Sequence, residues 1–355
     1  MRKIFSSTPA AIFGLLLHLG ASVGANAQPA IEPGSHSFPQ ITLPDAAHGE
    51  QAIRALGQHL PEIAQAYGKS IEQLTDLLGR DRTLTVDRRG RLFYLDDTLP
   101  LPQPETTQQS DALVATAAES LDQTFFLHSR RGAKRIIYLD FNGHVLSGTA
   151  WNAQYTGGQP INCPPFDFEG GPSVFTLNEL TAIQEIWQRV AEDYAPFDVD
   201  VTTEDMGEAA LTRSSSTDEY YGVRVLISPI SSYFGPYGGI AYVGAFNDTS
   251  DYYKPALVFP ENLGPNSARY VAEACAHEAG HTLGLSHDGT TTGDAYFRGY
   301  GTGETSWAPI MGASYSRNVT QWSKGEYTNA NNQEDDLAII ASYVGFRPDD
   351  HGNDS

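Results

Sequence analysis

The sequence predicts an α+β protein in which helices pack on a mixed sheet, preceded by a smaller unit of helices and a hairpin. A strong strand signal at 134–141 is followed by a long amphipathic segment, several strand-like runs and a second helix. A stretch rich in proline, threonine, glutamine and serine separates these elements from an earlier helical region. Strands interleaved with helices favour a sheet covered by helices, and a polar stretch of this composition is typical of a linker.

The first 27 residues have the pattern of a signal peptide. Arg2 and Lys3 precede an apolar run, and "ANA" at 25–27 supplies the small residues of a cleavage site. The apolar run is too short to cross a bilayer comfortably, and no other segment approaches that length. We therefore expect an exported protein, periplasmic or extracellular, without a membrane span.

Residues 28–98 are predicted to form a small leading domain, with a linker at 99–123. Helical patterns cover 49–67 and 70–78. The run "TLTVDRRGRLFYL" then alternates on both sides of Arg89-Gly90, which indicates a hairpin. This unit is interpreted as a pro-domain, and the alternative is an accessory domain that stays attached.

A larger domain is predicted over 124–350. Thr176 and Glu179 form a capping-box pattern that begins a long helix. One face of this helix is predicted to be buried, because apolar residues recur along it at helical spacing. Further strands are expected at 198–203, 222–228, 239–246 and 255–259.

The formal net charge of -21 argues against a nucleic-acid partner and against an anionic membrane surface. About 40% of the residues are apolar, which is enough for a packed core. Asp198, Asp200, Glu204 and Asp205 are a candidate Ca²⁺ cluster, with a solvated strand end as the alternative.

The motif "HEAGHTLGLSHD" at 277–288 predicts a zinc site. His277 and His281 are four residues apart and so project from one helix face. Glu278 can accept a proton from a water that zinc makes acidic. Gly284 can adopt the left-handed conformation that ends a helix, which lets the chain bring His287 back as a third ligand. The alternative is a histidine-rich helix end without function.

The motif resembles the extended zinc-binding pattern of the metzincin metallopeptidases. "WAPIMGASY" at 307–315 resembles the methionine-containing turn of that clan, with Met311 as its methionine. Asp288, directly after the third histidine, makes the motif resemble that of the reprolysin-like branch. The resemblance covers about 134–345. It implies a mixed, mainly parallel five-stranded sheet, an active-site helix, this turn and a closing helix at 331–346.

The resemblance also implies zinc-dependent cleavage of protein or peptide substrates bound in extended form. The strand at 239–246 is the candidate edge against which such a peptide would pair, with an ordinary sheet strand as the alternative. Some metzincins have a metal-binding tyrosine two residues after the methionine, but this position is Ala313 here. Tyr315 is a candidate for the same role, with packing as its alternative.

The chain has two cysteines, Cys163 and Cys275. Export to an oxidising compartment favours a disulfide between them, and two free buried thiols are the alternative. Some metzincin relatives are held inactive by a cysteine in the pro-segment. Residues 28–124 contain no cysteine, so that mechanism is excluded for them.

Two other classes of function are considered. The first is an exported binding protein that contains zinc without catalysis. The second is a glycan hydrolase with paired carboxylates, although no spacing identifies such a pair. The substrate and the oligomeric state are left open by the sequence.

Overall fold

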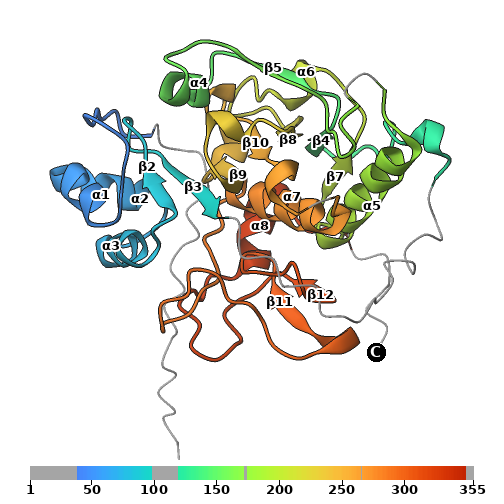
Figure 1. The fold of residues 1–355 in the computed structure, drawn as a ribbon. Coiled ribbons are helices and arrows are strands. Elements are labelled where there is room, and N and C mark those ends of the chain that lie inside the picture. Colours follow the sequence, from blue (N-terminus) through green and yellow to red (C-terminus); the bar gives the residue numbers. More distant parts are fainter. Residues whose placement is uncertain (1–37, 98–118, 172–173, 265, 349–355) are drawn as a thin grey trace, which may run out of the picture. The chain divides into compact units, whose positions relative to one another are not determined.

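Strands from both parts of the chain join in one sheet. The computed structural model describes residues 38–97, 119–171, 174–264 and 266–348. Within these ranges the main sheet has eight strands in the order β1-β2-β3-β9-β10-β8-β4-β7. The pairs β10–β8, β8–β4 and β4–β7 are parallel, whereas the remaining pairs are antiparallel. The predicted mixed sheet with helices packed on it is confirmed in this coarse form (Figure 1). The predicted five-stranded, mainly parallel sheet is not, because β1, β2 and β3 extend the sheet to eight strands through antiparallel pairs.

The described elements before residue 98 are three strands and three α-helices. They are β1 (Ala47–His48), α1 (Gly49–Leu56), α2 (Leu60–Ala66), α3 (Ile71–Arg80), β2 (Leu84–Val86) and β3 (Leu92–Asp97). The helical pattern at 49–67 is therefore divided in two. Gly57 has φ 47° at the end of α1, and Pro61 stands at the start of α2. Both residue types commonly stand at helix ends.

The later elements are strands and helices in mixed order. In chain order they are β4 (Arg135–Asp140), β5 (His144–Leu146), α4 (Ala150–Tyr155), β6 (Ile161–Cys163), α5 (Leu177–Asp193), β7 (Val199–Thr202), α6 (Glu208–Leu211), β8 (Tyr221–Ile227), β9 (Tyr237–Tyr242), β10 (Ala256–Val258), α7 (Ala268–Thr282), β11 (Trp307–Pro309), β12 (Val319–Gln321) and α8 (Asp336–Val344). The capping box of Thr176 and Glu179 forms at the start of α5 as predicted.

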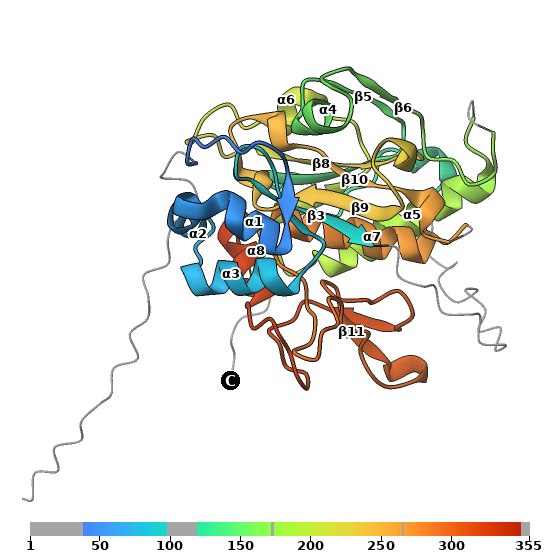
Figure 2. The same ribbon diagram turned by 60° about the vertical axis from the view of Figure 1, so that its left-hand side comes forward.

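The two faces of the sheet have separate hydrophobic cores. Helices α5 and α7 cover one face, where Ile137, Val225 and Val258 are buried. Helix α4 and the two-stranded sheet of β5 and β6 cover the other face, around Trp151 and Leu226 (Figure 2). Successive strand residues such as Val225 and Leu226 enter different cores because side chains alternate across a strand.

The leading part has a third core, built from the helices α1 to α3 and strands β2 and β3. Val243, which follows β9, also belongs to this cluster. All described residues lie in one contact-defined unit, Glu32–Ser355. The predicted domain boundaries at 98 and 124 stay a prediction, and the signal peptide at 1–27 lies outside the described residues.

Strand β9 is not an edge in this structure. Residues 239–246 are the candidate open edge, with an ordinary sheet strand as the alternative, and the alternative holds here: β9 is paired with β10 on one side and with β3 on the other. The sequence did not reveal this, because β3 precedes β9 by more than a hundred residues.

The predicted Cys163–Cys275 disulfide is wrong for this structure, since both thiols are free and buried. Cys163 lies on β6 in the core under α4, whereas Cys275 lies on α7 in the core of the opposite face. Burial raises the pKa of the Cys163 thiol to about 11 and that of Cys275 well above its ordinary value.

No helix in the described parts of the chain combines the length and the apolar character that crossing a bilayer needs.

The packing of α5 predicts the effect of truncating one core side chain. Ile183 is fully buried between this helix and the sheet, whereas Leu177, at the start of the same helix, is 71% exposed. We expect Ile183→Ala to lower the free energy of unfolding by about 3 kcal/mol. The matched control Leu177→Ala should change it by less than about 0.5 kcal/mol. Urea unfolding measures both, and equal losses would contradict the assignment of Ile183 to the core.

Candidate metal centre

Helix α7 presents two histidines inside the protein. The helix begins after Ser267, whose side chain accepts a hydrogen bond from the backbone N–H of Tyr270. Almost all of its residues are buried, because it packs against both α5 and the sheet. His277 and His281 are 7% and 0% exposed and lie on the same face, one helical turn apart.

The chain turns sharply after α7 and brings a third histidine to the same place. Gly284 has φ 92°, a backbone conformation that glycine adopts without strain. A Cβ atom at Gly284 would also lie 3.1 Å from the Tyr343 hydroxyl oxygen. The segment that follows carries His287, which is 2% exposed.

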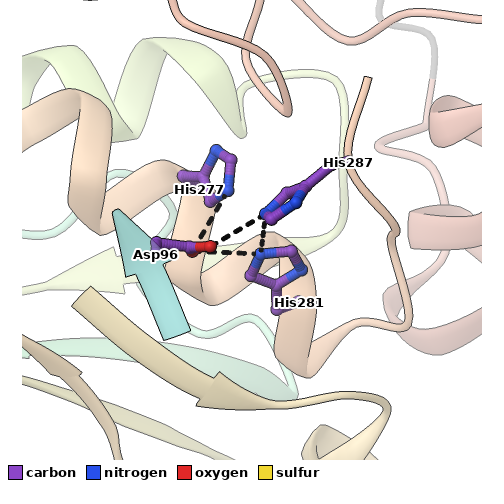
Figure 3. Close-up of side chains that lie close together, drawn as sticks. All are labelled: Asp96, His277, His281 and His287. Atoms are coloured by element: carbon purple, nitrogen blue, oxygen red, sulfur yellow. Dashed lines mark hydrogen bonds and ion pairs between the residues drawn. The ribbon is translucent and has the colours of Figure 1, made fainter. Parts of the chain in front are cut away.

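The three histidines and Asp96 converge on one point (Figure 3). One ligand atom from each of the four residues lies within 4.8 Å of the others. The Nε2 atoms of His281 and His287 are 3.1 Å apart. Asp96 Oδ2 is 3.3 Å from His277 Nε2 and 3.2 Å from His281 Nε2, while Oδ1 is 2.9 Å from His287 Nε2.

Each imidazole is oriented by an acceptor at its other nitrogen. His277 Nδ1 donates to the Ile310 carbonyl at 2.8 Å, and His281 Nδ1 donates to the Leu285 carbonyl at 2.9 Å. His287 Nδ1 faces Asp81 Oδ2 at 2.8 Å. Because these oxygens only accept, the hydrogen of each neutral ring is on Nδ1. The Nε2 lone pairs are then free to bind a metal, an arrangement that is common around histidine ligands.

This cluster needs a cation. Lone pairs of neutral imidazoles at this separation repel one another, and a carboxylate beside them adds negative charge. His277 Nε2 is buried without a hydrogen-bond partner among the described residues. Two zinc ligands in a tetrahedral site are roughly 3.3 Å apart, given Zn–N distances of about 2.0–2.1 Å. The nitrogen separation and the donor types therefore fit zinc.

The electrostatics of the histidines differ from ring to ring. Burial lowers the pKa of His281 to about 4, so this ring is neutral. Burial also opposes protonation of His287, but Asp81 and Asp96 outweigh it and raise the pKa of that ring to about 10. A metal ion would compete with this proton for the same Nε2 atom.

The predicted methionine turn lies directly beneath the helix. Met311 is fully buried, and a Cβ atom at Gly280 would lie only 2.8 Å from its sulfur. The neighbouring Ile310 supplies the carbonyl that orients His277. The turn thus contacts α7 between the two helical histidines, by packing and by one hydrogen bond.

Asp288 is buried directly after His287 but does not belong to the cluster of ligand atoms. The backbone N–H of Asp288 donates to the Met311 carbonyl at 2.8 Å, which ties the third histidine to the turn. Burial raises the pKa of the Asp288 carboxyl to about 7. The Tyr315 ring packs edge-on against Tyr270 with a centroid distance of 5.4 Å, in line with the packing alternative.

Glu278 is 1% exposed and lies beside the histidine cluster against strand β9. A Cβ atom at Gly239 would lie 2.2 Å from Glu278 Oε1, so the close approach of helix and strand depends on glycine there. Glu278 Oε2 has no hydrogen-bond partner in the described ranges. Burial, together with the charge of Asp96, raises the pKa of this carboxyl well above its ordinary value.

The sequence analysis did not identify the fourth member of the cluster. Asp96 lies on β3, in the leading part of the chain, and is 6% exposed. Tyr296 donates a hydrogen bond from its hydroxyl to Asp96 Oδ1 at 3.0 Å. Tyr94, two residues before Asp96 and on the same strand face, stacks on the His281 ring with a centroid distance of 4.1 Å.

Three of the four candidate calcium residues contact basic side chains instead, and the fourth, Asp205, accepts a hydrogen bond from the backbone N–H of Gly207. His128 lies between Asp200 at 2.6 Å and Glu204 at 2.7 Å, and Arg130 contacts Asp198 at 2.6 Å. These partners already satisfy the carboxylates, so the structure gives the calcium prediction no support.

Comparison with known proteins agrees with the geometry. Residues 181–323 match the family model Reprolysin_5, described as metallo-peptidase family M12. No curated protein matches the chain. The family match includes the three histidines and Met311, and it confirms the resemblance to metzincin-type zinc metallopeptidases. Peptidases of this family use zinc, and a peptide is the substrate that the class implies.

The geometry predicts that His281 is required for metal binding. We expect the full chain to hold about one zinc ion, and His281→Ala to weaken zinc binding by more than about 100-fold. His144, half-buried at the start of β5, provides the control variant His144→Ala, which should bind zinc as the natural chain does. Competition with a chromophoric chelator measures the affinities, and unchanged binding by His281→Ala would exclude this site.

Proposed function

We propose that the protein is an exported zinc-dependent endopeptidase with Glu278 as its general base. The observation that carries the proposal is the convergence of three histidine Nε2 atoms beside a buried glutamate and a sheet strand. His277, His281 and His287 would hold the zinc ion. Export rests on the signal-peptide pattern at 1–27, and the periplasm and the extracellular space both fit it.

Zinc bound at this site supplies Lewis-acid chemistry, by making a water molecule more acidic and polarising a carbonyl group. Glu278 accepts the proton from the attacking water and delivers it to the leaving amine. Its position beside the histidine cluster suits this task, because one buried carboxyl can serve both transfers.

Strand β9 is the proposed platform for the substrate. It passes next to Glu278, since Gly239 lies against that side chain. An extended peptide could add to β9 through backbone hydrogen bonds in the position that β3 takes here. Pairing of this kind is independent of side-chain identity, which fits an endopeptidase acting on extended chains.

A zinc-containing binding protein without catalysis is the second candidate. It is favoured by one observation, the presence of a carboxylate as a fourth protein group at the histidine cluster. Metal sites with four protein ligands are usually structural, whereas catalytic zinc sites keep a position open.

Casein hydrolysis separates the two candidates. The assay should use the purified chain both intact and after a cut within 98–118, with zinc analysis of each sample. A peptidase gives cleavage that a chelator abolishes and added zinc restores. Bound zinc with no cleavage in either form would favour the binding protein.

Replacing Glu278 tests its role. We expect Glu278→Ala to lower kcat by at least about 100-fold, because the proton acceptor is lost. We expect the zinc content to stay the same, because the Glu278 carboxylate is not one of the proposed zinc ligands. Peptide cleavage and metal analysis on one preparation measure both effects. Loss of zinc in this variant would show that the glutamate has a different role.

Two adjacent glycines provide a matched test of the strand. A methyl group at Gly239 would collide with the Glu278 carboxylate, whereas one at Gly238 would meet the terminal methyl group of Leu263 at 2.9 Å. We expect Gly239→Ala to lower kcat by about tenfold or more through displacement of the base. Gly238→Ala should have a smaller effect, since a flexible side-chain end can move. Equal kcat values for the two variants would contradict the placement of Glu278.

A further inference from the structure

We propose that the Tyr296 hydroxyl is a catalytic hydrogen-bond donor, which stabilises the negative charge that develops on the carbonyl oxygen of the scissile peptide bond. This inference rests on the proposed function, because it adds a residue to the reaction of the same site. It gives a role to a tyrosine that lies outside both the histidine motif at 277–288 and the methionine turn at 307–315.

The Tyr296 hydroxyl lies at the histidine cluster and donates to an oxygen atom there. Its acceptor is Asp96 Oδ1, at 3.0 Å. The same oxygen lies 2.9 Å from His287 Nε2. This separation is close to the roughly 3.3 Å between two ligand atoms of one tetrahedral zinc site. Asp96 Oδ1 thus marks a point beside the cluster where the protein accommodates a negatively charged oxygen, and Tyr296 donates to that point.

The Tyr296 ring is packed among the histidine rings. Its centroid lies 4.4 Å from that of His287 and 6.3 Å from that of His277. Tyr296 is 8% exposed, so the surrounding side chains restrict its motion. A donor that is held in place before the reaction needs no reorganisation when charge develops, and in a site with little water it stabilises that charge more than water does.

The backbone beside Tyr296 is fixed by the part of the chain that carries the histidines. The N–H of Phe297 donates to the Asp288 carbonyl at 2.6 Å, and the Phe297 carbonyl accepts from the N–H of Ala313 at 2.9 Å. A Cβ atom at Gly312 would lie only 2.6 Å from the Phe297 carbonyl oxygen, so the methionine turn approaches this loop closely. These contacts place Tyr296 without using the leading part of the chain.

The methionine turn itself presents no tyrosine hydroxyl two residues after Met311. That position is Ala313, whose N–H binds the loop that carries Tyr296. Tyr315, farther along the turn, packs edge-on against Tyr270. The phenol hydroxyl that reaches the cluster therefore comes from the loop after the third histidine.

The hydroxyl acts while water attacks the peptide carbonyl. The water oxygen forms a bond to the carbonyl carbon, the π electron pair moves onto the carbonyl oxygen, and Glu278 accepts the water proton. Tyr296 keeps its own proton and donates a hydrogen bond to the oxygen that has become negative. When the C–N bond breaks, the electron pair on that oxygen re-forms the C=O bond, and the amine leaves with the proton from Glu278. Because the hydrogen bond strengthens as charge develops, it raises kcat.

The substrate position proposed above brings the carbonyl oxygen within reach of this donor. An extended peptide that takes the position of β3 along β9 replaces Asp96 as well, since Asp96 belongs to β3. The acceptor that Tyr296 has in the structure is then exchanged for an oxygen of the substrate.

Tyr296→Phe tests the inference, because it removes the hydroxyl and keeps the ring. The full chain is assayed with a quenched fluorescent peptide in the two forms used for casein, intact and cut within 98–118. We expect kcat to fall by about 10- to 100-fold while KM changes by less than about threefold. An unchanged kcat would overturn the inference.

Tyr327→Phe is the matched control. Tyr327 also has a buried hydroxyl, which donates to the Gly289 carbonyl at 2.8 Å, in the region that follows the third histidine. This variant should keep kcat within about threefold of the natural chain, because its hydroxyl does not face the cluster of ligand atoms. Equal losses of kcat in the two variants would indicate a general loosening of the region and would overturn the inference.

Two binding measurements give readouts that do not depend on turnover. Zinc affinity, measured by competition with a chromophoric chelator, should be the same in Tyr296→Phe and the natural chain, whereas a loss of zinc would show that the tyrosine binds the metal instead. A phosphinic pseudopeptide resembles the tetrahedral anion, so calorimetry should show at least about tenfold weaker binding of this probe by Tyr296→Phe. Tyr327→Phe should bind it as the natural chain does.

These readouts separate the inference from the proposed function. If the natural chain binds the probe more tightly than Tyr296→Phe but cleaves no peptide, the hydroxyl binds the anionic oxygen and the peptidase proposal alone fails. If the natural chain cleaves peptides and Tyr296→Phe matches it in kcat and in probe affinity, the enzyme is a peptidase and the role of Tyr296 is wrong. A natural chain that neither cleaves peptides nor binds the probe in either form would overturn both.

Discussion

The structure depends on a positive charge at the point where three imidazoles and a carboxylate meet. His277, His281, His287 and Asp96 are all buried, so water cannot compensate the charges and lone pairs gathered there. A metal ion would satisfy the cluster, and the neighbouring carboxylates of Asp81 and Asp96 favour positive charge on His287 by raising its pKa. The surrounding packing is arranged to hold this cluster. The methionine turn, the end of α7 and the leading segment each supply an acceptor to one ring.

Local chemistry explains what the sequence could predict. His277 and His281 are four residues apart on a helix, and Gly284 follows that helix, so three candidate ligands could be identified from twelve residues of sequence. The capping box at Thr176 is equally local and forms as expected. Met311 needed the resemblance to a known family, because a methionine more than twenty residues beyond His287 has no local signal of its own.

The remaining part of the site comes from long-range contacts. Asp96 and Asp81 are 185 and 206 residues away in sequence from the histidines they contact. Strand alternation placed Tyr94 and Asp96 on one face of the hairpin, but nothing in the sequence identified the strand beside it. The same limitation explains why the disulfide predicted from the sequence is not formed in the structure. Two cysteines in an exported chain favour a bridge, and only the fold puts Cys163 and Cys275 on opposite faces of the sheet.

The joining of β3 to the rest of the sheet within one chain has a thermodynamic consequence. As long as β3 and β9 belong to one chain, β3 stays at a high effective concentration beside β9, so even a modest pairing affinity keeps it in place. If the chain were cut between the two strands, the same contacts would have to form between separate molecules at whatever concentration the surroundings provide. The covalent connection, rather than any single contact in the ladder, therefore sustains the pairing.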